Sequence, residues 1–286
     1  SCLVLADISD IAFKVDNFNV SNMSKIENKW ISIMKALRAS IELVSNFGYD
    51  SQTLTATYAV IPIAYFMLNS DNMDRLVQSS RYREDRKRIS KWLRISLIKR
   101  SFSGQPDNVL RPIRRILSEN PGEFPYSKIV DHFKGTNKSL TFAAEDIESL
   151  LDYKYGESHT FSVLSLLYPT LDFKNRFHQD HIHPRSYFRP SELRKKKIPE
   201  EKRELYLKYH DSIGNLQLLE GLPNEEKSNM DFETWLEKTY PDKNERRDYM
   251  QRHLIPADID LGFENFIAFH EARDQLLLEK LKEALS

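Results

Sequence analysis

Residues 177–188, FHQDHIHPRSYF, and residues 211–232, DSIGNLQLLEGLPNEEKSNMDF, decide the local fold of the second half of this chain. The first stretch alternates in polarity as a strand does, and Pro184 ends it because proline cannot donate to a strand ladder. The second stretch predicts a Gly-Asn turn, a short strand and then a helix. The order predicts a strand–loop–strand–helix unit with polar residues at the ends of its apolar runs, namely Asp180, His181, Asn215 and Asn224.

The rest of the chain has the pattern of a mainly α-helical protein. Only eight of its 286 residues are glycine, and apolar residues recur every three to four positions in the long segments. Residues 24–46 predict an amphipathic helix that starts with a capping box at Ser24 and Glu27. A polar break divides the chain into a predicted helical domain, 1–158, and a second domain, 159–286. Further helices are expected at residues 52–69, 71–100, 109–119, 143–153 and 263–285, a loop at 101–108, and a helix or a strand at 161–168.

Composition restricts the partners and the environment. The 42 basic and 42 acidic residues give no net charge, so any anionic partner must be met by a local patch. A single cysteine, Cys2, excludes a disulfide framework and fits a reducing cytoplasm. The longest apolar run, residues 53–68, is short for a membrane span and contains Pro62, so we expect a core helix and no membrane contact. The first residue, Ser1 rather than Met, indicates a fragment or a processed chain.

The polar residues suit phosphodiester hydrolysis. That reaction requires a base for the attacking water, a counter-charge for the phosphate, and a cation or acid at the leaving oxygen. One divalent metal and one histidine together supply all three. Carboxylate and amide oxygens suit Mg²⁺ or Mn²⁺. Asp180 and His181 are of the right types, although neighbours on a strand point to opposite faces unless the strand ends there.

The order DHI-x-P, GNL-x-LL and N-x-x-K-S resembles the HNH, or ββα-metal, nucleases. The surrounding sequence resembles the C-terminal nuclease half of GmrSD-type restriction endonucleases and related phage-defence effectors. The resemblance implies a mainly α fold with an embedded ββα-metal unit, and a DNA endonuclease that nicks or cuts in bacterial antiviral defence. It also implies an upstream sensor or NTPase domain or subunit. We expect that partner outside this chain, because the chain has no phosphate-cradling glycine-rich loop.

The same resemblance implies a role for each polar residue. Asp180 is a metal ligand and His181 is the general base. Asn215 braces the loop that carries the base, and Asn224 is a second metal ligand. Lys227, one turn further on, meets phosphate. The cofactor implied is one divalent metal, Mg²⁺ or Mn²⁺ rather than Zn²⁺.

Other interpretations of these residues stay open. Asn215 alone suits an ordinary turn, and Asn224 alone suits a helix N-cap. His178, His181 and His183 suit a zinc site instead, and His183 has no assigned role. The whole chain also suits a nucleic-acid-binding helical module with an inactive HNH remnant, or an RNase. The gap between the two quoted stretches is long for a minimal HNH unit, and we expect it to hold an inserted helix pair, SELRKKK and EEKRELYLKYH.

Basic residues gather in three places. Residues 81–100 hold nine Lys or Arg against two acids, and Arg111, Arg114 and Arg115 follow. Such runs form either a solvated helix face or a surface that neutralises phosphates. The third group is nearest the expected catalytic residues, so we expect it to contact the DNA backbone: Arg185, Arg194, Lys195, Lys196 and Lys197.

Overall fold

The computed structural model describes residues 2–70, 73–169 and 171–286. The chain divides into two compact units, one up to Thr141 and one from Phe142 to Ser286. About 64% of the residues are helical, which confirms the predicted mainly α fold. The predicted domain boundary at 158/159 refers to domains that fold independently. The division into compact units does not test this, so the boundary stays a prediction. Within the described ranges, no helix is long and apolar enough to cross a membrane.

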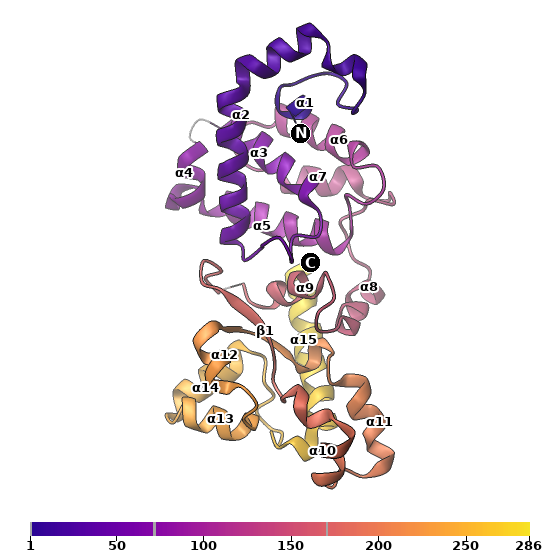
Figure 1. The fold of residues 1–286 in the computed structure, drawn as a ribbon, viewed down its shortest axis with the longest axis vertical. Helices are drawn as coiled ribbons and strands as arrows, with labels where there is room; N and C mark the ends of the chain where they lie inside the picture. The colour runs from indigo at the N-terminus through magenta and orange to yellow at the C-terminus, as the bar shows by residue number, and fades with distance from the viewer. Residues whose placement is uncertain (1, 71–72, 170) are drawn as a thin grey trace. The chain divides into compact units, whose positions relative to one another are not determined.

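The first unit is built from helices (Figure 1). Helix α3 is its most buried element, because every residue from Val60 to Met67 is shielded from water. Trp92 is fully buried and packs against the rings of Phe102 and Phe124. The α-helices are α1 Cys2–Leu5, α2 Val20–Asn46, α3 Val60–Leu68, α4 Met73–Gln78, α5 Arg83–Ile98, α6 Asp107–Glu119 and α7 Tyr126–Phe133, with 3-10 turns at Val15–Phe18, Thr57–Ala59 and Ser80–Tyr82.

The predicted helices of this unit exist, but several of their ends differ. Helix α2 begins at Val20 rather than near Ser24, because the side chain of Asn19 accepts a hydrogen bond from the Asn22 amide at 3.0 Å and caps it. The predicted helix 71–100 is interrupted near Ser79, and its residues 71–72 lie outside the described residues. The guanidinium of Arg86 donates to the Ser79 carbonyl at 2.7 Å across this interruption.

The second unit contains the two strands, which form an antiparallel hairpin with Asp180 opposite Gln217. Both predicted strands are therefore confirmed, and the predicted inserted helix pair is present as α10 and α11. Residues 161–168, which were predicted as either a helix or a strand, form most of α9. The elements are α8 Ala144–Glu148, α9 Thr160–Leu167, β1 Phe177–His181, α10 Pro190–Lys195, α11 Glu200–Tyr209, β2 Leu216–Glu220, α12 Gly221–Lys227, α13 Phe232–Thr239, α14 Lys243–Arg252 and α15 Phe266–Leu285, with 3-10 turns at Ser149–Asp152, Arg185–Phe188, Ile213–Asn215 and Phe263–Asn265.

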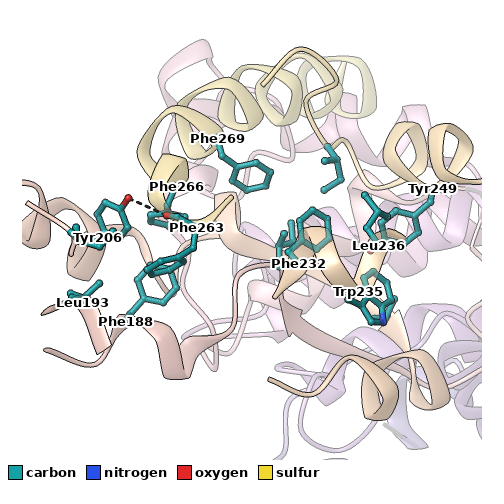
Figure 2. Packing of buried hydrophobic residues seen from close by; sticks show 14 residues of the cluster. Phe188, Leu193, Tyr206, Phe232, Trp235, Leu236, Tyr249, Phe263, Phe266 and Phe269 are labelled. Atoms are coloured by element: carbon teal, nitrogen blue, oxygen red, sulfur yellow. Dashed lines mark hydrogen bonds between the residues drawn. The ribbon is translucent and has the colours of Figure 1, made fainter. Parts of the chain in front are cut away.

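Aromatic side chains form much of the core of this unit (Figure 2). Phe188 packs edge-on against Phe263 and Phe266, with ring centroids 5.0 and 4.8 Å apart. The hydroxyl of Tyr206 on α11 donates to the Phe263 carbonyl at 3.1 Å, as the dashed line in Figure 2 marks. Large buried rings contribute strongly to stability. This cluster therefore fixes the chain that follows β1 against the start of α15.

Candidate active site

Asn215 holds the chain that follows β1 against the turn that precedes β2. Its side chain is fully buried. Its Oδ1 accepts from the His183 amide at 2.9 Å, and its Nδ2 donates to the carbonyls of His183 at 3.1 Å and His210 at 2.8 Å. Its own carbonyl accepts from the Ile182 amide at 2.8 Å. These contacts are those of a brace for the loop after His181, and an ordinary exposed turn residue would not make them.

Helix α15 fixes the turn that carries Asn215. Arg273 is fully buried, and its guanidinium donates to the carbonyls of Ile213 at 3.0 Å and Gly214 at 2.9 Å. A Cβ at position 214 would lie 2.5 Å from Asp274 Oδ1 and would overlap the ring of His270. Only glycine therefore allows the turn to approach the helix this closely.

His181 lies on one side of the hairpin, with Asp211 as its partner. Its Nε2 is 2.7 Å from Asp211 Oδ1, and an ionised carboxylate can only accept, so Nε2 carries the proton. The other ring nitrogen, Nδ1, keeps its lone pair. Burial lowers the pKa of His181, and the hydrogen bond to Asp211 opposes that shift.

Asp211 also binds two other groups. Its Oδ2 accepts from Arg185 Nη2 at 3.0 Å and lies 3.1 Å from His210 Nε2. The Tyr155 ring lies against His181, with centroids 4.7 Å apart, and the Tyr155 amide donates to the Asp211 carbonyl at 2.7 Å. We call these five residues, Tyr155, His181, Arg185, His210 and Asp211, the histidine side.

Asp180 lies on the opposite side of the hairpin. Its Oδ2 accepts from Gln217 Nε2 at 2.8 Å and lies 3.0 Å from Lys227 Nζ. Lys227 also donates to the His181 carbonyl, and Gln217 Oε1 accepts from the Tyr249 hydroxyl at 2.5 Å. We call these four residues, Asp180, Gln217, Lys227 and Tyr249, the carboxylate side. The strand continues through His181, so the two predicted site residues point to opposite faces.

The surroundings of Lys227 correct the predicted phosphate contact. Its side chain is fully buried, and its ammonium is the counter-ion of Asp180. Burial lowers the pKa of this ammonium, and the Asp180 carboxylate opposes the shift. In this arrangement Lys227 faces the protein interior, so its visible contribution is to hold Asp180 and the end of β1 in place.

The carboxylate of Asp180 and the amide oxygen of Asn224 are of the kind that a hard cation prefers, and the Lys227 ammonium lies 3.0 Å from the Asp180 carboxylate. Among the described residues, both partners of Asp180 contact Oδ2, and no hydrogen-bond partner contacts Oδ1. Asn224 precedes Lys227 by three residues, which places both side chains on one side of α12, and α12 packs against both strands. The N-cap interpretation of Asn224 is wrong, because the helix starts at Gly221 and its N-cap is Glu220.

The three histidines of the zinc alternative do not converge. In the part of the chain that the structure describes, no group of three or more His, Cys, Asp or Glu side chains is arranged to hold a metal. His183 is fully buried among phenylalanine rings, and burial lowers its pKa to about 3. Neither of its ring nitrogens has a hydrogen-bond partner among the described residues. His183 therefore acts as a neutral core side chain.

The comparisons with known proteins concern this part of the chain. Residues 134–259 match the family model described as GmrSD restriction endonucleases, C-terminal domain. This segment resembles a GmrSD C-terminal domain, as its motifs predict. The match includes the hairpin, α12 and both sides of the site. A search of curated proteins found no match.

The GmrSD-like segment also presents basic side chains to solvent. Arg194, Lys195 and Lys197 are exposed at the end of α10, whereas the Lys196 ammonium lies 4.0 Å from the centre of the Tyr187 ring. The side chain of Arg185 is 60% exposed. The predicted basic cluster is therefore accessible except at Lys196, which packs on an aromatic surface.

A pocket of about 460 Å³ in the GmrSD-like segment adjoins the histidine side, because Arg185 and His210 belong to both. Its other lining residues include Arg189 and Asn229. The sequence did not point to Asp211, Arg189 or His210 as site residues. The available signal was the position of Asp211, four residues before Asn215, at the start of the stretch with the nuclease motif.

Proposed function

We propose that this chain is a metal-dependent DNA endonuclease with an HNH-type site, the cutting module of a bacterial antiviral restriction system. One observation carries the proposal. In the GmrSD-like segment, His181 is held by Asp211 at 2.7 Å, directly before a loop that the buried Asn215 braces. The match to restriction endonucleases supports a nuclease. The hairpin and α12 are the proposed ββα-metal unit.

His181 acts as the general base in this proposal. Its Nδ1 takes the proton of the attacking water, because Nε2 already donates to Asp211. The Asp211 carboxylate orients the ring and stabilises the imidazolium that forms. Arg185 and Arg189 bind the substrate phosphate from the adjoining pocket. The side chains of Arg194, Lys195 and Lys197 contact the DNA backbone and add affinity that does not depend on the DNA sequence.

Asp180 and Asn224 are the proposed ligands of one divalent metal, Mg²⁺ or Mn²⁺. When bound, it supplies positive charge for the phosphate oxygens and the leaving oxygen. Lys227 and Gln217 hold the Asp180 carboxylate in its position on the hairpin. We place this reaction in the cytoplasm, with an upstream sensor or NTPase domain or subunit as the partner that triggers it.

The test is a plasmid assay with the purified chain. Supercoiled plasmid is incubated with Mg²⁺, Mn²⁺ or EDTA, and with wild type, His181→Ala and the control His178→Ala. We expect metal-dependent nicking or cutting that His181→Ala abolishes and His178→Ala retains, with plasmid binding unchanged. Cleavage of matched RNA but not of DNA would show an RNase instead. Nicking by His181→Ala at the wild-type rate would overturn the assignment of the base.

A further inference from the structure

The first unit contains a pocket that the proposed nuclease site does not use. Its volume is about 640 Å³, within the usual range for small-molecule sites. Helix α6 contributes Arg111, Arg114 and Arg115, α7 contributes His132, α3 contributes Tyr65, and the residues after α1 contribute Asp7. The pocket lies outside the segment that matches the GmrSD family, which begins at residue 134.

The acidic groups at this pocket already have cationic partners. Asp7 lies 2.9 Å from Lys29 Nζ and accepts from the Tyr65 hydroxyl at 2.6 Å. Asp10, beside the pocket, lies 2.7 Å from Arg111 Nη2. These contacts neutralise both carboxylates and occupy Arg111.

Two guanidinium groups of the pocket have no such partner. Among the described residues, no carboxylate lies within ion-pair distance of Arg114 or Arg115. Arg114 instead donates to two neutral carbonyls, those of Ile8 at 2.6 Å and Ser9 at 3.4 Å. Its guanidinium is therefore held in place without an ion pair, although the nearby charge of Arg114 helps to lower the pKa of Asp7. Arg115 follows it on α6 and is exposed.

A second pocket in the same unit shows the contrast. It measures about 470 Å³, and its basic residues Arg88 and Lys128 lie beside Glu119 and Glu123. Arg88 is 2.6 Å from Glu123 Oε2, so its charge is neutralised. The presence of a basic residue at a pocket is therefore not sufficient evidence for an anion site. The α6 pocket differs because two of its guanidinium groups, those of Arg114 and Arg115, form no ion pair with the described residues.

We propose that the α6 pocket binds the dianion of a phosphomonoester through Arg114 and Arg115. Guanidinium groups bind phosphate oxygens with paired, charge-assisted hydrogen bonds. Arg114 is fixed by the backbone before any ligand arrives, which reduces the entropy lost on binding. His132 lines the same pocket and adds a ring N–H donor, whereas the Ser118 hydroxyl already donates to the Arg115 carbonyl at 2.8 Å. A phosphomonoester occurs on a free nucleotide and on a 5′-phosphorylated DNA end, and both present the same group.

The experiment measures binding to the full chain by calorimetry in EDTA, which removes any contribution of metal at the proposed nuclease site. The probes are a nucleoside 5′-monophosphate and a short DNA duplex with or without 5′-phosphates. The variants are Arg115→Gln and Arg114→Gln, and the control is Arg81→Gln, which is exposed outside the pocket. Arg115→Gln is the primary variant because Arg114 also supports the backbone.

We expect a phosphomonoester probe to bind, and Arg115→Gln to weaken it by about 10-fold or more. Arg81→Gln should leave the affinity unchanged. Binding of the nucleoside monophosphate identifies a nucleotide as the source, and binding of only the 5′-phosphorylated duplex identifies a DNA end. Two results would overturn the proposal: no binding of any phosphomonoester probe at about 1 mM, or equal binding of the duplex without 5′-phosphates.

Discussion

Asp180 and His181 are adjacent in the chain, yet their side chains lie in different surroundings on the two sides of the β1–β2 hairpin. On the histidine side, Arg185 is largely exposed and a pocket adjoins the carboxylate of Asp211. On the carboxylate side, Asp180 faces the fully buried Lys227. Both sides contain an ion pair, but the cation of one pair, Arg185, is 60% exposed, whereas the cation of the other, Lys227, is fully buried. The difference indicates that residue type alone does not decide whether a charge acts on a ligand or on the fold.

The largest effect that sharpens this comparison is on catalysis. His181→Ala should lower the rate of plasmid cleavage by roughly 10²- to 10⁴-fold, because it removes the base. Plasmid binding should change little, since the base acts in the chemical step. Single-turnover cleavage and a gel-shift titration measure the two quantities separately. Equal losses in both would indicate damage to the fold.

The next effect concerns stability on the carboxylate side. Lys227→Met should lower the free energy of unfolding by about 3 kcal/mol or more, because it leaves the Asp180 carboxylate buried without its counter-ion. On the histidine side, Arg185→Met should lower it by less than about 1 kcal/mol, because that pair is screened by water. Urea denaturation followed by tryptophan fluorescence measures both. Adding Asp180→Asn to Lys227→Met should recover part of the loss, and a further loss would contradict the pair.

The next prediction concerns Asp211, whose substitution should slow catalysis less than that of His181. Asp211→Asn should lower kcat by roughly 10- to 100-fold with little change in KM. The reason is that the Asp211 carboxylate orients the His181 ring but does not itself take the proton or bind the substrate. Asp211→Glu should restore part of kcat, since it keeps a carboxylate. A rise in KM alone, with kcat intact, would place Asp211 in substrate binding instead.

Acid should weaken the second unit through its buried histidines. Burial lowers the pKa of His253 to about 3 and of His270 to about 4, so between pH 6.5 and 4 the unfolded chain binds their protons and the folded chain does not. Stability from these groups is present above pH 6.5 and falls on acidification. Burial raises the pKa of Asp274 to about 7, which acts in the opposite sense, since the folded form keeps that proton. His183, with a pKa of about 3, adds to the two histidines.

Among these four groups, three histidine protons oppose one carboxyl proton. The free energy of unfolding should therefore fall by about 1–3 kcal/mol per pH unit below pH 6.5. Denaturation at several pH values measures the slope. His183→Leu should reduce it by about one proton, roughly 1.4 kcal/mol per pH unit, and an unchanged slope would mean that His183 is charged in the folded state.

The smallest effect concerns DNA affinity. Reversal of Arg194, Lys195 and Lys197 to Glu should weaken binding to unrelated DNA sequences. It should also reduce the slope of log affinity against log salt, by about one for each phosphate that is no longer neutralised. Reversal of the exposed Arg81, Arg83 and Lys87 should change the slope less. The opposite ranking would place the DNA on the first unit.

Local patterns predicted the elements that depend on them. The alternation of FHQDHIH predicted β1, and the Gly-Asn turn followed by apolar residues predicted β2. The start of α2 was predicted wrongly at Ser24, because the side chain of Asn19 caps the helix five residues earlier. The interruption at Ser79 was missed because the residues around it are charged and keep a helical pattern.

The contacts of the site could not be read in the same way. Asp211 and His181 are thirty residues apart, and nothing local to either shows that they meet. The burial of Lys227 contradicts the usual exposure of lysine, and only the fold brings it to Asp180. The roles of Asp180, His181, Asn215 and Asn224 stay predictions, although the hydrogen bonds of Asn215 are those that its role requires.

The amide of Asn215 has one more consequence. Its Nδ2 donates both to His183, where the inserted segment with α10 and α11 leaves the hairpin, and to His210, where that segment returns. The insert is therefore a long connection between the two strands, an excursion from the hairpin, and the Asn215 side chain joins its two ends. The entropy of closing such an excursion changes slowly with its length. A change in length at the connection between α10 and α11, away from the buried Phe188 and Tyr206, should therefore leave in place the hairpin that carries Asp180 and His181.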